Sequence, residues 1–177
     1  MAALMTHLGH QRFAVMGHDR GGRVAHRLAR DHPERIAGMA VLDIAPTLSM
    51  YEQTDMVFAK AYYHWFFLIQ PAPLPETLIG ADPEFYLRRK IGSWGASGDV
   101  HSDDAMAEYL RCFQGETVHA SCEDYRAAAS IDLEHDRADA GAGGPVAALC
   151  LQYRGVAGAL GEPGAADLRD APAMVVR

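Results

Sequence analysis

The stretch "VMGHDRGGRVAHRLA", residues 15–29, places a sharp turn between an apolar segment and a helical pattern. Asp19 stands at the apex of this turn, between Gly17 and Gly21. The pattern G-x-nucleophile-x-G, after a strand and before a helix, is typical of a nucleophile elbow. Such a turn is strained, needs small residues on both sides and lifts the nucleophile above the sheet. The stretch therefore predicts a reactive carboxylate at Asp19, with a helix-capping Asp as the plainer alternative.

The segments around this turn predict an α/β fold. The apolar runs "RFAVMG" (residues 12–17) and "IAGMAVLDI" (residues 36–44) are short and bounded by turn residues, as buried strands of a parallel sheet are. Between them, residues 20–31 have helical spacing, and this helix should end before Pro33. Strand, helix and strand in this order form a βαβ unit. A later run, "GPVAALCL" at residues 144–151, predicts a return to the same sheet.

The region between these strands has a different character. No strand pattern occurs from residue 48 to residue 140, which instead holds aromatic and helical segments and a proline-rich break, "QPAPLPETL". We therefore expect three parts: residues 1–47 as the core with the elbow, 48–140 as a helical cap, and 141–177 as a return strand with an irregular tail. Residues 152–177 fit neither period, so a native tail and a frame-shifted end both stay open.

The composition narrows the classes of function and location. Of the 177 residues, 49 % are hydrophobic and 22 % are charged, which is ordinary for a globular protein. The net charge of −7 argues against a nucleic-acid partner. We expect no membrane span and no secretion signal, because no apolar run reaches about 20 residues and the start lacks a basic segment. The three cysteines form no C-x-x-C pair, which favours a cytoplasmic protein without disulfides or a metal site.

Several motifs in order resemble one known family. The stretches "GHDRGGRVAHRLARDHPERI", "AVLDIAPT", "YYHWFFLIQPAPLPETLIGADPEFY" and "CEDYRAAASIDLEHD" are similar to the haloacetate (fluoroacetate) dehalogenases of the α/β-hydrolase superfamily, over roughly residues 4–151. The resemblance implies a partial α/β-hydrolase core with a helical cap. It also implies a hydrolase that cleaves the carbon–halogen bond of small 2-haloacids without a cofactor or metal. The family tends toward dimers, which leaves a homodimer open.

The resemblance assigns roles to four residues of the core. It implies that Asp19 is the nucleophile and that Arg20 and Arg23 hold the substrate carboxylate. The substrate is a small anion, so two guanidinium groups would offset its repulsion from the attacking carboxylate. Asp43, in "VLDI", matches the acidic partner of the family's catalytic histidine. Taken alone, Arg23 reads as a solvated helix charge and Asp43 as the start of a turn.

The resemblance also assigns roles to three residues of the cap. His64, Trp65 and Tyr125 match the residues with which the family binds the leaving halide. Imidazole N–H, indole N–H and phenol O–H are all hydrogen-bond donors, and fluoride needs such donors as it leaves. Without the resemblance, "YYHWFF" reads as an aromatic core cluster.

The sequence departs from the family at both ends. It opens in the helix before the nucleophile strand, so early strands and a loop that supplies a second oxyanion N–H have no counterpart. None of the nine histidines follows His135, so no position matches the catalytic histidine. Ester hydrolysis needs a base for water. We therefore expect this chain to turn over once or not at all, as an inactive fragment of such an enzyme would.

Two other functions stay open. An epoxide hydrolase on the same core would use two cap tyrosines, and Tyr62, Tyr63 and Tyr125 are candidates. Alternatively, the chain is a non-catalytic remnant or an interaction module.

Overall fold

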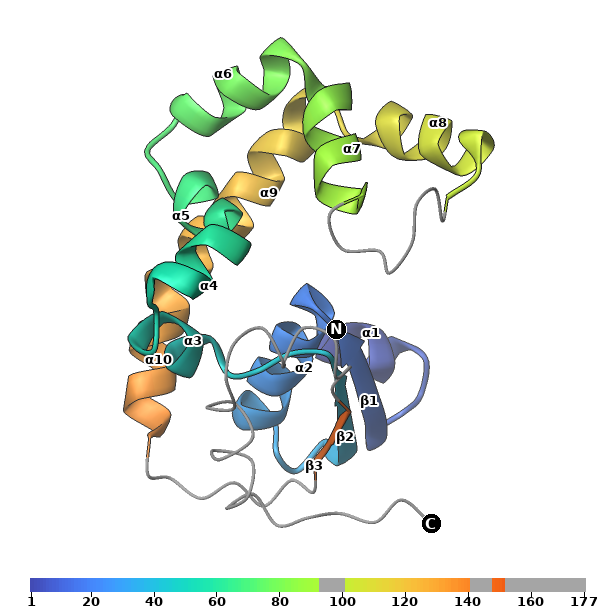
Figure 1. Ribbon diagram of the computed structural model, residues 1–177. Coiled ribbons are helices and arrows are strands. Elements are labelled where there is room, and N and C mark those ends of the chain that lie inside the picture. The colour runs from blue at the N-terminus through green and yellow to red at the C-terminus, as the bar shows by residue number, and fades with distance from the viewer. Residues whose placement is uncertain (93–100, 141–147, 152–177) are drawn as a thin grey trace. The chain divides into compact units, whose positions relative to one another are not determined.

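The structure, a computed structural model, describes residues 1–92, 101–140 and 148–151. The chain divides into two compact units (Figure 1). The core unit comprises residues 1–58 and 135–177, and the cap unit comprises residues 59–134. The two boundaries between these units, after residue 58 and after residue 134, both lie inside the segment 48–140 that the sequence suggests as a cap.

The core unit is built on a parallel sheet of three described strands. These are β1 (Phe13–His18), β2 (Ile36–Leu42) and β3 (Ala148–Leu151), in the order β1-β2-β3. Gly17 pairs with Val41 and His18 with Leu42, so β1 and β2 end at the same edge of the sheet. The predicted α/β class is therefore confirmed, including the return strand close to the carboxyl end of the sequence.

Helix α2 (Arg20–Asp31) lies against β1 and β2 (Figure 1). Its buried residues are small and recur at helical spacing: Gly22, Ala25 and Ala29. Small side chains let a helix approach a sheet closely. The same unit contains α1 (Ala2–His7) and α3 (Thr47–Glu52).

Two acidic residues tie the end of α10 (Ile131–Asp139) to the core unit. The Asp136 carboxylate accepts a hydrogen bond of 3.3 Å from the Leu48 N–H. Asp139 accepts from Arg27 at 2.8 Å and from Arg30 at 3.3 Å. These contacts explain why the end of α10 belongs to the core unit rather than to the cap.

The cap unit is helical in its described residues. It holds most of α4 (Met56–Ala61) and the start of α10, and between them lie α5 (Tyr63–Leu68), α6 (Leu74–Ala81), α7 (Pro83–Gly92), α8 (Asp103–Cys112) and α9 (Gly115–Ala128). Helix α9 contacts α5 and α6. The buried centre of the cap unit is formed by Leu68, Ile79, Val118 and Cys122, with partly buried aromatic rings packed around them.

Helix α9 and helix α10 are separate helices. The break lies at Ala129 and Ser130. Across the described ranges, no helix combines the length and the apolar character of a membrane crossing.

Candidate active site

Asp19 occupies a strained turn between β1 and α2. Its backbone has φ 49° and ψ −122°, a conformation that non-glycine residues rarely adopt. Its N–H donates to the Leu42 carbonyl at 3.3 Å, and its own carbonyl accepts from the Gly22 N–H at 2.9 Å. The side chain is exposed. Strand, strained acidic residue and helix thus follow one another as in a nucleophile elbow.

Two glycines, Gly17 and Gly22, permit this turn. The motif instead suggests Gly17 and Gly21. A Cβ at Gly17 would overlap the Gly21 carbonyl group and lie 2.6 Å from the Gly22 nitrogen. A Cβ at Gly22 would lie 2.8 Å from Cγ2 of Ile44. A Cβ at Gly21 would meet no atom of the residues that the structure describes within 4 Å. The expectation that Gly21 must be small for packing is therefore wrong, and Gly22 carries that requirement.

Asp43 directly follows β2, as Asp19 follows β1. It also has a positive φ, of 54°, and is exposed. Since His18 pairs with Leu42, the two aspartates leave the sheet at the same edge, on neighbouring strands. In open α/β sheets, this carboxyl edge is where ligands bind.

Arg20 and Arg23 occupy the first turn of α2, next to the elbow, and both are half-buried. Nη1 of Arg23 donates to Oγ1 of Thr47 at 2.5 Å and to the Ala45 carbonyl at 3.3 Å. Thr47 is itself buried. The guanidinium of Arg23 is therefore held by the chain that follows Asp43.

Tyr51 lies near both guanidinium groups. Burial raises the pKa of its phenol, and the positive charges of Arg20 and Arg23 counteract part of that rise. A phenol between two cations is a polar contact for an anion that they would bind. Neither Thr47 nor Tyr51 stands out in the sequence, because each lies more than 20 residues from the elbow in an ordinary helical segment.

In the cap unit, the three predicted residues form one aromatic cluster. His64 and Trp65 are buried, with 5 % and 4 % of their surface exposed. The Tyr125 ring packs edge-on against both, with centroids 5.7 Å from His64 and 6.3 Å from Trp65. Tyr62 completes the cluster, 6.0 Å from His64 and 6.2 Å from Trp65. The structure thus brings His64, Trp65 and Tyr125 together within their unit, as it does the four predicted residues of the core unit.

The sequence gives no sign of the cation that accompanies this cluster. Nζ of Lys90 lies 2.9 Å from Nδ1 of His64. Burial, together with the Lys90 charge, lowers the pKa of His64 to about 3, so its imidazole is neutral near pH 7. In the sequence, "LRRK" is typical of a solvated helix face, and only the fold brings its last residue to His64.

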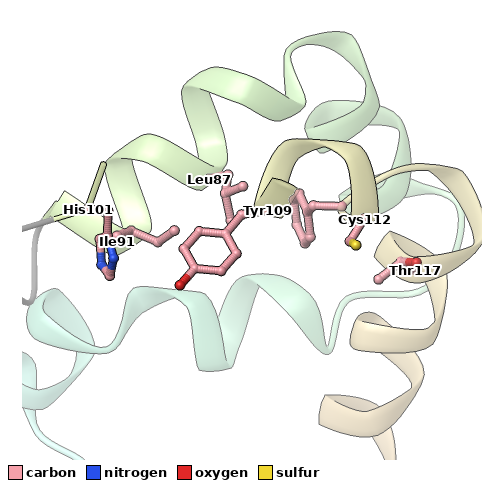
Figure 2. A pocket seen from close by; sticks show the side chains of 7 residues that line it. Leu87, Ile91, His101, Tyr109, Cys112 and Thr117 are labelled. Atoms are coloured by element: carbon pink, nitrogen blue, oxygen red, sulfur yellow. The ribbon is translucent and has the colours of Figure 1, made fainter. Parts of the chain in front are cut away.

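Two other features of the cap unit contain no predicted site residue. A cavity of about 430 Å³ lies among α7, α8 and α9, and Figure 2 shows its side chains: Leu87, Ile91, His101, Tyr109, Cys112, Phe113 and Thr117. A second feature groups Glu76, His119 and Glu123 at metal-ligand spacing. Arg126 donates to Glu76 at 2.8 Å and to Glu123 at 2.5 Å, so a guanidinium already offsets part of the charge of these two carboxylates.

Comparison with known proteins gives several relatives. A fluoroacetate dehalogenase from Burkholderia sp. is 48 % identical over 140 residues, which are 78 % of this chain and 46 % of the relative. A soluble epoxide hydrolase from Corynebacterium sp. (strain C12) is 30 % identical over 137 residues, which are 75 % of this chain and 48 % of the relative. The chain therefore spans about half the length of these curated relatives.

A solved structure agrees with them. The crystal structure of an alpha/beta hydrolase from Nostoc sp. PCC 7120 is 53 % identical, with a TM-score of 0.87. The match covers 96 % of this chain and 59 % of the other. Residues 1–131 also match the family described as alpha/beta hydrolase fold. With its parallel sheet, its elbow and these matches, the chain belongs to the alpha/beta hydrolase fold family.

Proposed function

We propose that this chain carries the chemistry of a haloacetate dehalogenase, a hydrolase acting on small 2-haloacids. The observation that carries the proposal is the elbow: a strained aspartate, where an acyl-transfer enzyme would have serine, with two half-buried arginines in the first turn of the helix that follows it. A carboxylate is suited to attack on a saturated carbon, because it forms an alkyl ester there. The similarity to a fluoroacetate dehalogenase over 78 % of the chain supports this choice of chemistry.

The first step transfers an alkyl group to Asp19. One carboxylate oxygen forms a bond to the α-carbon of the haloacetate, and the carbon–halogen bond breaks as the halide leaves with its electron pair. Arg20 and Arg23 bind the substrate carboxylate, which offsets the repulsion between two anions and aims the α-carbon at Asp19. The product of this step is an aspartyl ester and a free halide ion.

The halide leaves toward hydrogen-bond donors. We assign this role to His64, Trp65 and Tyr125, whose N–H and O–H groups can donate to an anion. Such donors matter most for fluoride, on which the negative charge is the most concentrated.

The second step adds water to the ester and releases the hydroxyacid. It needs a general base, and we assign to Asp43 the role of orienting an imidazole rather than replacing it. No histidine follows His135 in the sequence. For the 177-residue chain we therefore expect the ester to accumulate instead of turning over.

Intact mass spectrometry tests the proposal directly. After incubation with fluoroacetate or chloroacetate, we expect a mass increase of one carboxymethyl group, located on the peptide that contains Asp19. D19N should abolish the adduct, whereas D103N, which alters an exposed aspartate of α8, should leave it unchanged. Absence of any adduct in the wild-type chain would contradict the proposal. Halide release at many equivalents per chain would contradict the expected accumulation of the ester.

An epoxide hydrolase is the second candidate, because two phenols flank the same cluster. The Tyr62 and Tyr125 rings both pack edge-on against Trp65, and a pair of tyrosines is what epoxide opening requires. The similarity to a soluble epoxide hydrolase is consistent with it. This reaction has no use for Arg20 and Arg23. Styrene oxide offered beside chloroacetate distinguishes the two candidates, since an adduct from the epoxide alone would favour the second.

A further inference from the structure

The Lys90 side chain of α7 contacts two residues of α5, His64 and Tyr63. Nζ of Lys90 lies 2.9 Å from Nδ1 of His64, within hydrogen-bond range. The ammonium also lies over the Tyr63 ring, 5.3 Å from its centroid. His64 is 5 % exposed and Lys90 is half-buried. The lysine is thus held by an acceptor and an aromatic face together.

The chemistry of the two groups determines where the imidazole proton lies. A lysine ammonium has three N–H donors and no acceptor, so Nδ1 of His64 must accept in this contact. A nitrogen that accepts carries no proton. The ring is neutral, because burial and the Lys90 charge lower its pKa to about 3, and a neutral imidazole carries one proton. That proton is therefore on Nε2.

The orientation of the ring is fixed by its neighbours. Tyr62 stacks against His64 with an angle of 27° between the planes, and Tyr125 packs against it edge-on. Rings on two sides and a cation at Nδ1 leave the imidazole little freedom to flip. A fixed donor costs less to reorganise when charge develops on a leaving group.

We propose that Lys90 is a positioning residue, which holds His64 as the Nε2–H tautomer so that this N–H donates to the departing halide. This inference rests on the proposed function. It specifies that the halide is received by a neutral donor backed by a half-buried cation, which favours small halides that accept strong hydrogen bonds. The rate of ester formation should therefore depend on Lys90 more strongly with fluoroacetate than with bromoacetate.

Nitrogen NMR of the full 177-residue chain tests the tautomer without any need for activity. Proton–nitrogen correlation spectra distinguish the two neutral tautomers, and the His64 signals are identified by their loss in H64Q. We expect the Nε2–H form in the wild type and in K90R, which keeps a cationic donor. K90M should shift His64 to a mixture or to the Nδ1–H form. R88M, an exposed change on the same helix, should alter nothing. An Nδ1–H form in the wild type, or an unchanged tautomer in K90M, would overturn the inference.

The rates of ester formation test the consequence for the leaving group. K90M should lower the rate about 10-fold or more with fluoroacetate and less than about 3-fold with bromoacetate, and K90R should restore most of the difference. An equal loss with both substrates would show a merely structural role and overturn the inference while the proposed function stands. If the wild type forms no ester with any haloacetate, the proposed function itself fails, and the assignment of Lys90 to the halide fails with it.

Discussion

Single residues of the elbow show how little space the turn leaves. Gly17 faces backbone atoms of Gly21 and Gly22, which cannot move without displacing the start of α2. Gly22 faces chiefly the Ile44 side chain instead, with Cγ2 at 2.8 Å and Cδ1 at 3.1 Å from a Cβ placed there. The three glycines of "GHDRGG" thus differ in what surrounds them, although they look alike in the sequence.

Alanine substitutions should therefore separate these glycines. We expect G17A to destabilise the core unit most, by about 3 kcal/mol or more, because backbone must shift. G22A should cost about 1 to 2 kcal/mol, since Ile44 can adjust. G21A should leave stability unchanged or raise it, because alanine favours a helix over glycine. Urea unfolding followed by circular dichroism measures all three. A G21A variant as unstable as G17A would contradict this interpretation.

The residues that the sequence could identify are those in local patterns. Asp19 follows from the spacing of the elbow, and Asp43 from its place after a buried strand. Thr47, Tyr51 and Lys90 could not be identified, because their significance lies in contacts with residues distant in sequence. Arg23 is an intermediate case: its charge is visible, but its bond to Thr47 is not.

At the scale of elements, the sequence predicts a helix boundary where a residue that starts or stops a helix is present. Helix α2 has the predicted bounds, residues 20–31, because the elbow starts it and Pro33 follows its end. The division between α9 and α10 carries no glycine or proline. It is marked instead by Ser130, whose hydroxyl donates back to the Arg126 carbonyl at 2.7 Å. Such a local bond competes with the helix, and it is too common in sequences to signal a break.

Arg126 joins elements of the cap that no local pattern connects. From α9, its guanidinium donates to Glu76 of α6 and to the Gln70 carbonyl before that helix. It is 17 % exposed. On α8, Arg111 makes an equally short pair with Glu108, three residues away, but both side chains are exposed. Both arginines lower the pKa of their glutamates to about 2.

Although the pKa values of Glu76 and Glu108 are equally low, we expect their two arginine partners to contribute unequally to stability. We expect R126M to lower the free energy of unfolding by about 2 to 3 kcal/mol, because it leaves Glu76 and a carbonyl without their donor. R111M should lie within error of the wild type, since solvent screens an exposed pair within one helix. Tryptophan fluorescence in urea reports on the cap through Trp65, which is buried there. Equal losses in the two variants would refute this difference.

At the scale of the whole molecule, the sequence predicts the classes of the parts but not their limits. The change from alternating strands and helices to helices alone is visible near residue 48. The core unit nevertheless extends to Phe58 and resumes at His135. The reason lies in Asp136 and Asp139, which bind Leu48, Arg27 and Arg30 of the core unit. Polar contacts of this kind do not produce a periodic pattern in the sequence. A domain boundary that depends on them therefore cannot be predicted from the spacing of hydrophobic residues.

His64 and Glu76 both make the stability of the cap depend on pH, because the pKa of each is lowered in the folded protein. His64 titrates near 6.5 when unfolded and near 3 when folded, so below pH 6.5 the unfolded chain binds the extra proton. Glu76 is lowered from 4.5 to about 2, chiefly by Arg126, so its contribution is lost as pH falls from 4.5 toward 2. Both effects have the same sign: acidification destabilises the cap.

Between pH 6 and pH 5 the contribution of His64 exceeds that of Glu76, because the unfolded pKa of Glu76 is 4.5. We expect the free energy of unfolding of the cap to fall there by up to about 1.4 kcal/mol per pH unit, the slope for one proton. H64Q should flatten this slope, because glutamine fills the site without titrating. H101Q replaces an exposed histidine of the same unit and should keep the wild-type slope. Urea titrations at several pH values, read by tryptophan fluorescence, give both slopes. A wild-type slope of zero across this interval would mean that His64 is charged in the folded protein, and a charged ring could not accept a hydrogen bond at Nδ1 from Lys90.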